Sequence, residues 1–571
     1  MARLTPLSKG ILTALVVGVA GYAAWLTLKP GSDTSSAPAV PLSPATVSHS
    51  GQSTPASNPA VVATAAAGSG AAATTLPSGA LGSSGNPLKV SIVSFHGYAP
   101  ALVANGNSLT TQPGSIFARH GINVEFVIQD DVPSLATIFE SGSAQCAWRT
   151  SDFWAQEQPN LRNAGLDAKA IMVVDNTQGA DAVIASDPNI KRIEDLPGHS
   201  VAMLRFTPSH GLFTDAVESS SLTARKRQSI KRVFISAEEG TGGVRAAYTS
   251  GAVDAAVLWD PDLSLAMRER PGSHVVYSTE TATNLIYDVI VCDSRVVANA
   301  QNTPTFDNFV GGWLEGVDFA RANPDAAVQA LMATEQFFTL LGQQEGAGFI
   351  KGLFNNLVWT NLADNARILG LSGGVNHYER VYARFDQIYR AEGALADPTS
   401  PVIAPQDSFD YRFVQRLLAK DARAKAEAAK PTETYSEAQR GEAMKGAARV
   451  TKPVFVNFPT GSSKLTKRAM RVIDTEMVPF IENNGRAYFE LSGHTDGTGS
   501  LDTNMRLSRE RADAVLKYLE SEWEIPGARL QVAGYGPSRP ICNEANPATE
   551  GMSLEDCRSV NRTTRLAVFQ K

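Results

Sequence analysis

LKVSIVSFHGYAP, residues 88–100, is the stretch that decides the fold of this 571-residue chain. It is an apolar, β-branched run that ends in Gly and Pro, and further β-rich runs follow it as far as residue 292. These are INVEFVI (122–128), KAIMVVD (169–175), DAVIAS (181–186), SVAML (200–204), KRVFIS (231–236), DAAVLW (254–259) and NLIYDVIVC (284–292). Helical patterns lie between them, at 132–140, 209–218 and 243–249. Alternating strands and helices predict an open α/β sheet whose ligand lies at the carboxyl ends of the strands.

Five motifs occur in order within this region. They are Gly97-Tyr98-Ala99-Pro100, SGSAQCA (141–147), GADAVIA (179–185), EDLPG (194–198) and SGAVDAAV (250–257), the last leading to Trp259-Asp260-Pro261. Together they resemble periplasmic substrate-binding proteins, most of all the group that serves nitrate, sulfonate, taurine and thiamine-precursor ABC transporters. The resemblance covers about residues 88–410 and implies a type II module of two α/β lobes that close on a small ligand. Its crossovers are expected near 179–186 and 287–292, which makes about 182–285 the inserted lobe.

The same resemblance nominates residues that line the cleft between the lobes. They are Tyr98, Trp148, Thr150, Asp152, Thr177, Asp181, Ser209, His210, Trp259, Asp260 and Asp288. The helix start at 207–210 offers free backbone N–H groups to an anionic oxygen, and the two tryptophans can wall an apolar or cationic group. The three aspartates Asp181, Asp260 and Asp288 disfavour a simple inorganic anion. We therefore expect an amine-bearing or zwitterionic organic solute.

Five of these residues also have a purely structural interpretation. Trp148 and Trp259 are equally typical of a core, Asp181 and Asp288 of a hinge, and His210 of a helix cap. Cys146 and Cys292 end strands and are expected as buried thiols, although the sequence leaves a bridge between them open. Residues 107–114 are extra relative to the family, and we expect them to reshape the entrance to the ligand site.

The last 120 residues carry the most specific motifs. Gly493-His494-Thr495-Asp496 follows a predicted strand, and the pattern N-x-x-L-S-x-x-R-A-x-x-V then spans residues 504–515. With the surrounding strands and helices, these motifs resemble the small α+β peptidoglycan-binding domain at the C-terminus of outer-membrane protein A, over about 452–571. The family implies that Asp496 binds the ammonium and Arg511 the carboxylate of diaminopimelate in the stem peptide, supported by Thr495 and Asn504.

Arg511 is notable on physical grounds as well. On a helical wheel it falls in the middle of the apolar arc that contains Ala512 and Val515, where an unpaired guanidinium is costly. It therefore needs an anionic partner, either a ligand or Asp496 itself in an internal ion pair. The resemblance also implies Arg562 as a peptidoglycan-binding residue, since it is the first arginine of the family's Asn-Arg-Arg-Val motif. The second arginine is absent, because the motif reads Asn-Arg-Thr-Thr here. Cys542 and Cys557 are predicted to form a disulfide, as expected in an oxidising periplasm.

The sequence of the N-terminal part predicts that the chain is exported from the cytoplasm. Residues 10–28 carry no charge and are long enough to cross a bilayer, with Arg3 and Lys9 on the cytoplasmic side. A cleaved signal peptide is the alternative. In residues 31–87, Ala, Gly, Ser, Thr and Pro supply 45 of 57 residues, which predicts a disordered linker from residue 29 to 87. A charged helical connector is expected at 411–451.

The composition, and the motifs that the sequence lacks, argue against several classes of function. A net charge of −6 without a long basic run argues against nucleic-acid binding, and no HExxH or Walker sequence is present. We expect a non-enzymatic, single-pass inner-membrane protein without cofactor or metal, which binds a small organic solute and attaches to peptidoglycan, with an ABC permease or another envelope protein as a candidate partner. The alternative is a structural tether from membrane to wall, whose central module binds a protein or nothing.

Overall fold

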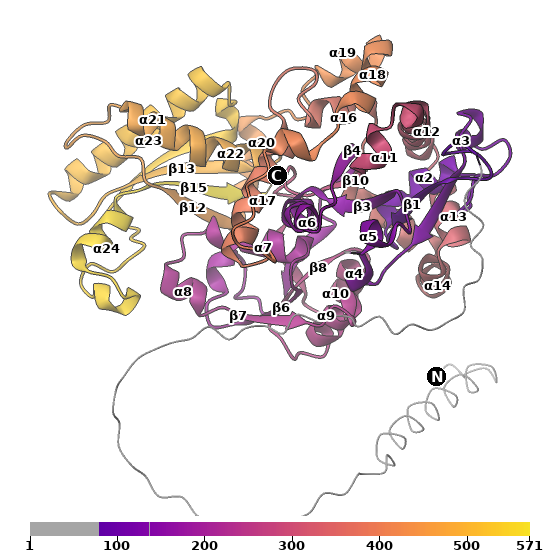
Figure 1. Ribbon diagram of the computed structural model, residues 1–571. Helices are drawn as coiled ribbons and strands as arrows, with labels where there is room; N and C mark the ends of the chain where they lie inside the picture. The colour runs from indigo at the N-terminus through magenta and orange to yellow at the C-terminus, as the bar shows by residue number, and fades with distance from the viewer. Residues whose placement is uncertain (1–78, 136, 571) are drawn as a thin grey trace, which may run out of the picture. The chain divides into compact units, whose positions relative to one another are not determined.

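The computed structural model describes residues 79–135 and 137–570 (Figure 1). The predicted membrane segment at 10–28 and nearly all of the predicted linker lie outside these residues. Within the described ranges, no helix is both long enough and apolar enough to cross a bilayer. The fold below therefore concerns the α/β region, the connector and the C-terminal domain.

The first lobe is built on a six-stranded sheet. Its strand order is β11-β4-β10-β3-β1-β2, with β1 Leu88–Ile92, β2 Val124–Ile128, β3 Cys146–Thr150, β4 Ala168–Thr177, β10 Tyr287–Asp293 and β11 Leu357–Trp359. β1 runs parallel to β2 and β3, whereas β10 is antiparallel to both β3 and β4. Every residue of β3 and β10 is buried, as expected for central strands covered on both faces.

The second lobe is inserted between β4 and β10. Its five strands run in the order β7-β6-β8-β5-β9, with β5 Asp181–Ala185, β6 Ser200–Leu204, β7 Lys231–Ile235, β8 Ala255–Trp259 and β9 His274–Ser278. Its helices are α7 Pro208–Glu218, α8 Ala224–Gln228, α9 Gly240–Thr249 and α10 Asp262–Glu269. The chain enters the lobe from β4 to β5 and leaves it from β9 to β10, close to the two crossovers expected from the sequence.

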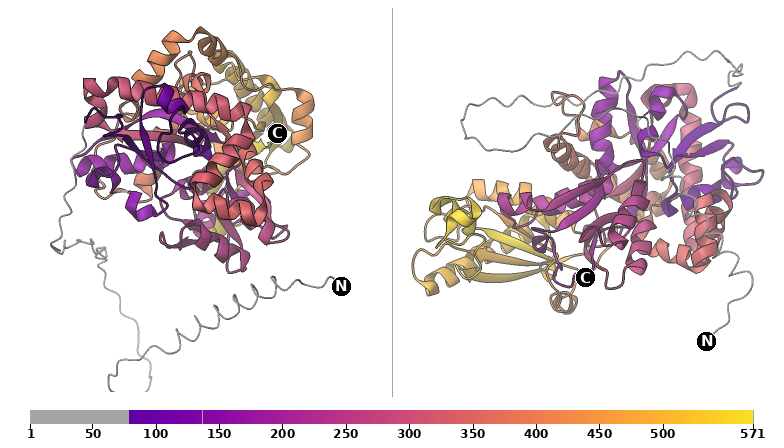
Figure 2. Two further views of the ribbon diagram at one scale, coloured as in Figure 1. Left: turned by 90° about the vertical axis from the view of Figure 1, so that its right-hand side faces the viewer. Right: turned by 90° about the horizontal axis from the view of Figure 1, so that it is seen from below.

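Helices surround the first sheet (Figure 2). Before the insertion they are α2 Ala99–Ala104, α3 Ile116–Arg119, α4 Val132–Leu135, α5 Ile138–Ser141 and α6 Ser151–Asn163. After it come α11 Ser294–Ala298, α12 Thr303–Ala322, α13 Pro324–Thr334, α14 Gln336–Glu345, α15 Ala347–Leu353, α16 Leu362–Ile368 and α17 His377–Ala391. The predicted connector contains three further helices, α18 Arg412–Lys420, α19 Ala422–Ala428 and α20 Glu437–Ala443.

Two sequence expectations change once the first sheet is seen. Cys146 and Cys292 are directly opposite each other on β3 and β10 and form a disulfide rather than buried thiols. The extra segment at 107–114 runs along the edge strand β2, where Phe126 N–H donates to the Leu109 carbonyl. It does not line either cavity of the cleft described below, because it satisfies the open edge of the sheet.

The C-terminal domain packs helices on one face of a four-stranded sheet (Figure 1). The strand order is β12-β15-β13-β14, with β12 Val450–Val454, β13 Tyr488–His494, β14 Leu530–Gly536 and β15 Thr564–Phe569. Its helices are α21 Lys467–Val472, α22 Val478–Asn483, α23 Leu501–Trp523 and α24 Leu554–Asn561. β13 and β14 are parallel and joined by α23. The buried residues of α23 include Leu507, Ala512, Val515 and Leu519, which belong to the apolar arc seen in the sequence.

Glycine lets α23 approach this sheet. A Cβ atom on Gly493 would lie 1.9 Å from the Ser508 carbonyl oxygen, and one on Gly534 would lie 2.5 Å from the Arg509 nitrogen. Two neighbouring strands therefore need glycine where they pass beneath the helix. This close contact fixes the position of α23 relative to the sheet. It thereby positions the loop that follows β13 and carries Asp496.

Candidate functional site

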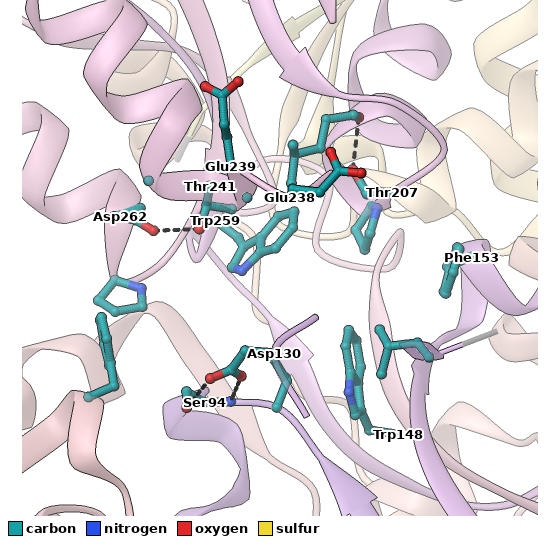
Figure 3. A pocket seen from close by; sticks show the side chains of 18 residues that line it. Ser94, Asp130, Trp148, Phe153, Thr207, Glu238, Glu239, Thr241, Trp259 and Asp262 are labelled. Atoms are coloured by element: carbon teal, nitrogen blue, oxygen red, sulfur yellow. Dashed lines mark hydrogen bonds between the residues drawn. The ribbon is translucent and has the colours of Figure 1, made fainter. Parts of the chain in front are cut away.

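The cleft between the lobes contains an outer cavity of about 300 Å³. Strand ends and helix starts from both lobes line it, as expected for an α/β sheet. Its lining includes Val93, Ser94, Asp130, Leu135, Trp148, Phe153 and Phe337 from the first lobe, and Leu204, Thr207, Pro208, residues 238–242, Trp259, Pro261 and Asp262 from the second. Figure 3 shows Glu238, Trp259 and Asp262 on one side of this hollow and Asp130 and Trp148 on the other.

A smaller inner cavity of about 30 Å³ continues from it. The lining residues are Val93, Phe95, Trp148, Thr150, Thr177, Asp181, Pro208, Trp259, Ile286 and Asp288. Six of the eleven residues nominated from the sequence are among them, namely Trp148, Thr150, Thr177, Asp181, Trp259 and Asp288. The two tryptophans line both cavities, so they mark the passage between them.

The other five nominated residues lie behind the lining. Tyr98 donates a hydrogen bond to Asp288 (Oη to Oδ2, 2.9 Å) and so contacts a residue of the inner cavity. Asp260 accepts from the Ser264 N–H and from Asn356 Nδ2, and is thus committed to the packing of its own neighbourhood. Asp152, Ser209 and His210 are buried and do not line either cavity. His210 Nδ1 accepts the Phe206 N–H just before α7, which agrees with the capping interpretation.

The inner cavity carries carboxyl groups that are costly to ionise. Burial raises the pKa of Asp288 to about 7, and burial together with the charge of Asp288 raises the pKa of Asp181 well above its ordinary value. Desolvation disfavours the charged form unless an opposite charge is supplied. In the part of the chain that the structure describes, no Lys, Arg or His lines this cavity.

Asp175 is a further buried carboxylate that the sequence motifs did not indicate. It lies opposite Asp288 where β4 pairs with β10, and its side chain is 0% exposed. Both carboxylate oxygens lack a hydrogen-bond partner among the described residues, and burial plus the charges of Asp288 and Asp181 raise its pKa well above its ordinary value. A Cβ atom on Gly97 would lie 2.0 Å from Asp175 Oδ2. This explains the glycine in the Gly97-Tyr98-Ala99-Pro100 motif.

The outer cavity is also acidic, which the sequence analysis missed. Asp130, Glu238, Glu239 and Asp262 line it, and no basic side chain is among its described lining residues. Asp130 is held in place by the Ser94 N–H (2.7 Å) and hydroxyl (2.8 Å), whereas Asp262 is partly neutralised by Arg245 at 3.2 Å. The sequence did contain an indication of this acidic lining, because these residues follow the carboxyl ends of strands β2, β7 and β8, where ligands bind in such sheets.

Helix starts add partial positive charge around the cleft, but most are already balanced. Asp152 lies in the first turn of α6 and Asp262 in that of α10, while Glu239 is the N-cap residue of α9. These carboxylates complement the positive ends of their helices. In contrast, α7 has no acidic residue either at its N-cap, which is Thr207, or in its first turn. In the cleft, an anion would therefore meet one helix N-terminus that no carboxylate compensates, whereas a cation would meet many carboxylates.

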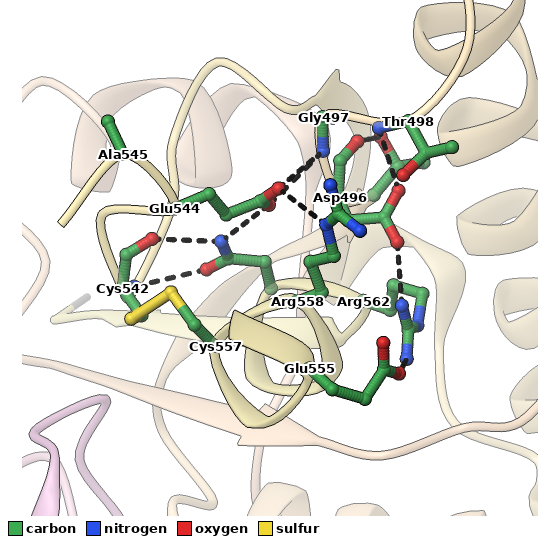
Figure 4. Close-up of polar contacts among 12 residues, drawn as sticks. Asp496, Gly497, Thr498, Cys542, Glu544, Ala545, Glu555, Cys557, Arg558 and Arg562 are labelled. Atoms are coloured by element: carbon green, nitrogen blue, oxygen red, sulfur yellow. Dashed lines mark hydrogen bonds and ion pairs between the residues drawn. A yellow bond between two sulfur atoms is a disulfide. The ribbon is translucent and has the colours of Figure 1, made fainter. Parts of the chain in front are cut away.

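The second candidate site is the loop after β13 in the C-terminal domain. Asp496 Oδ1 accepts the Thr498 N–H at 3.0 Å, and Oδ2 forms an ion pair with Arg562 at 2.6 Å (Figure 4). Burial raises the pKa of Asp496, but the hydrogen bonds from Arg562 and Thr498 together with the Arg562 charge outweigh burial, so the pKa lies below its ordinary value. The internal partner of Asp496 is thus Arg562, not Arg511 as the sequence alternative had it.

The Arg511 guanidinium is stabilised by other groups than the predicted anion. Its Nε donates to the Ser462 carbonyl at 3.1 Å and its Nη2 to the Pro459 carbonyl at 3.4 Å, while the guanidinium lies over the Phe458 ring. Backbone carbonyls and an aromatic face supply the stabilisation that the helical wheel assigned to an anion. Among the described residues, no carboxylate forms an ion pair with Arg511, so an anionic ligand group can still pair with it.

The remaining predicted residues support this loop. Thr495 Oγ1 donates to the Asp496 carbonyl, and Asn504 Nδ2 donates to the Thr498 carbonyl at 2.9 Å. The structure joins Cys542 to Cys557, and Asn561 links the Cys542 backbone to Glu544, which accepts the Gly497 N–H (Figure 4).

Two families match the two regions built above. Residues 112–327 match the family described as NMT1/THI5 like, and residues 457–551 match the OmpA family. The chain carries an NMT1/THI5-like module and an OmpA domain. The first match spans most of both lobes and the second contains Asp496 and Arg511, so the family resemblance drawn from the sequence motifs is confirmed.

Individual relatives cover only part of the chain. Outer membrane porin F of Pseudomonas aeruginosa is 31% identical over 113 residues, which are 20% of this chain and 30% of that protein. The peptidoglycan-associated lipoprotein of Pseudomonas putida is 37% identical over 84 residues, 15% of this chain and 49% of that protein. The matches to these two relatives span less than half of their lengths. Among solved structures, the periplasmic aliphatic sulphonate binding protein of Escherichia coli is 15% identical with a TM-score of 0.43, covering 57% of this chain and 97% of that one.

Proposed function

We propose that this chain is a non-catalytic binding protein of the bacterial periplasm. Its NMT1/THI5-like module takes up a small amine-bearing organic solute, and its OmpA domain attaches to peptidoglycan. The single observation that carries the solute class is the charge of the cleft. Asp130, Asp181, Glu238, Glu239, Asp262 and Asp288 line the two cavities, and no basic side chain is among the described lining residues.

The physical reason is the free energy of burying charge. A buried carboxylate with no cation nearby is destabilised and takes up a proton. An ammonium group in the inner cavity reverses this, because it pairs with Asp181 and Asp288 in a medium where charge-assisted hydrogen bonds are strong. A sulfonate or an inorganic anion would instead add to the negative charge already present.

The wall-binding half of the proposal rests on the loop that carries Asp496 and on Arg511. The name of the Pseudomonas lipoprotein associates that relative with peptidoglycan, and we extend this to the OmpA domain here. The ammonium of the stem peptide would bind Asp496. Its carboxylate would bind Arg511, which has no ion-pair partner in the part of the chain that the structure describes. We further propose that residues 10–28 anchor the chain in the inner membrane and that the segment up to residue 87 spaces it from the bilayer.

The test uses the purified full-length protein. Its unfolding temperature is measured with a panel of alkyl amines, alkyl sulfonates, nitrate and thiamine precursors, and small molecules that co-purify are identified by mass spectrometry. We expect amines alone to raise the unfolding temperature and Asp181→Asn to abolish the rise, whereas Glu140→Gln, an exposed carboxyl change on α5, leaves it intact. Stabilisation by sulfonates only would overturn the proposed solute class. No stabilisation by any compound would favour the alternative of a structural tether.

A further inference from the structure

The inner and outer cavities are two acidic sites joined through one aromatic passage. Val93, Trp148, Pro208 and Trp259 line both cavities. On the inner side of this passage lie Asp181 and Asp288, and on the outer side lie Asp130, Glu238, Glu239 and Asp262. We propose that the ligand is a linear dication, with one ammonium group at each end and an apolar chain between them. This rests on the proposed function of the same cleft and specifies its ligand class.

The inner cavity is suited to a fully desolvated ammonium group. Besides the two aspartates, Thr150 and Thr177 line it, and their side chains lie in residues only 4% and 2% exposed. Neither hydroxyl oxygen has a hydrogen-bond partner among the described residues. Buried polar groups are normally hydrogen-bonded. An ammonium group has three N–H donors and no acceptor, so it would satisfy a carboxylate and a hydroxyl at once.

The outer cavity offers a second, more solvated site. Glu238 is exposed, whereas Asp130 is fixed by Ser94 at the base of the cavity. Glu335 lies behind this lining and is 2% exposed, and burial together with the charge of Asp130 raises its pKa well above its ordinary value. The second site is therefore formed by the four carboxylates that line the outer cavity, Asp130, Glu238, Glu239 and Asp262.

The passage between the sites is suited to methylene groups. Trp148 and Trp259 lie on opposite sides of the hollow (Figure 3) and present aromatic surface to whatever passes between them. Apolar burial against two indole rings stabilises an alkyl chain. An ammonium near either ring also gains from the cation–π interaction.

A zwitterion fits the outer site less well than a dication. The first turns of α6 and α10 and the N-cap of α9 already hold protein carboxylates. An anionic ligand end in the outer cavity would face Glu238, Glu239 and Asp130 without a basic side chain from the described lining. Like charges that share a partly desolvated cavity repel each other, so an anionic end would weaken binding of the ligand. The structure therefore favours a positive charge at both ends of the ligand.

Titration calorimetry on the full-length protein at pH 8 tests this inference. The probes are α,ω-diaminoalkanes of three to eight carbons, and the controls are n-alkylamines of the same carbon number. We expect the best diamine to bind at least about tenfold more tightly than its matched monoamine, since a second ion pair adds about one factor of ten or more. One chain length should be optimal, because the two acidic sites are at a fixed separation.

Variants separate this inference from the proposed function. Glu238→Gln should bring the diamine down toward the affinity of the monoamine, because it removes one of the carboxylates that pair with the second ammonium group. Asp181→Asn should weaken both ligands, and Glu140→Gln should change neither. If diamines and monoamines bind equally, the two-site inference is overturned while amine binding stands. If neither binds, the proposed function itself fails.

Discussion

Amine binding by the cleft should weaken as the pH falls through neutrality. Burial raises the pKa of Asp288 to about 7. The groups around it are Tyr98, which donates to it at 2.9 Å, Asp175 on the neighbouring strand, Asp152 and Asp181. All but the tyrosine are acidic carboxyl groups. The pair formed with an ammonium ligand requires the ionised carboxylate, whereas the free site favours the protonated one.

The magnitude follows from the ionised fraction of Asp288. With a pKa of about 7, this fraction is about 0.9 at pH 8 and about 0.1 at pH 6. An alkyl ammonium stays protonated over the same range. The association constant should therefore fall about tenfold from pH 8 to pH 6, and further if Asp181 or Asp175 takes up a proton as well.

Calorimetry with one diamine at pH 6, 7 and 8, in buffers of different ionisation enthalpy, measures both the affinity and the protons released. We expect proton release near pH 6 and much less at pH 8. Asp288→Asn should lower the affinity at pH 8 and flatten its pH dependence, whereas Asp254→Asn, in the exposed turn before β8, should preserve both. An affinity that stays constant from pH 6 to 8, or that rises toward acid, would refute the assignment of Asp288 as a ligand-binding carboxylate.

The C-terminal domain yields three further predictions. Asp496→Ala and Arg511→Ala should each reduce co-sedimentation with isolated sacculi at least tenfold, while Arg506→Ala on the same helix binds normally; equal retention of all three would count against the clamp. Gly493→Ala should destabilise the domain by more than about 2 kcal/mol in urea unfolding, because its Cβ would lie 1.9 Å from the Ser508 carbonyl oxygen; an unchanged midpoint would contradict the close packing. Replacing both Cys542 and Cys557 by Ala should lower the free energy of unfolding by about 3 kcal/mol for a separation of 15 residues. If the difference between the unchanged protein and the variant disappears in reducing buffer, the disulfide is its source.

The sequence predicted which residues form the loop after β13 better than it predicted their pairing. Asp496, Thr495 and Asn504 lie together as the GHTD and N-x-x-L-S motifs indicate, because the glycine-rich turn and the capped helix are local features. The partner of Asp496 was not predictable in the same way. Arg562 reaches it from 66 residues away along the chain, and Arg511 is stabilised by carbonyls of a loop almost 50 residues upstream. Such pairings depend on how separate elements pack.

The cleft shows the same limit on a larger scale. Asp181, Trp259 and Asp288 belong to strands that the periodicity predicts, whereas Trp148 and Thr150 were nominated by the family resemblance. All five line the inner cavity. The outer carboxylates were missed because exposed acidic residues after a strand are common on any surface. Only the approach of two lobes makes Glu238 and Asp130 face the same hollow.

Local pattern determined the alternating α/β plan, and the order of short motifs determined, through their family resemblance, the two lobes, the position of the insertion and the type of the C-terminal domain. Strand and helix periodicity, glycines and capping residues act over a few positions, so they can be read along the chain. Tertiary structure decided which charges meet. The Cys146–Cys292 bridge, the opposition of Asp175 and Asp288, and the Asp496–Arg562 pair each join residues more than 60 positions apart. Electrostatic interaction depends on distance in space and on burial, and neither is contained in the order of residues until the chain has folded.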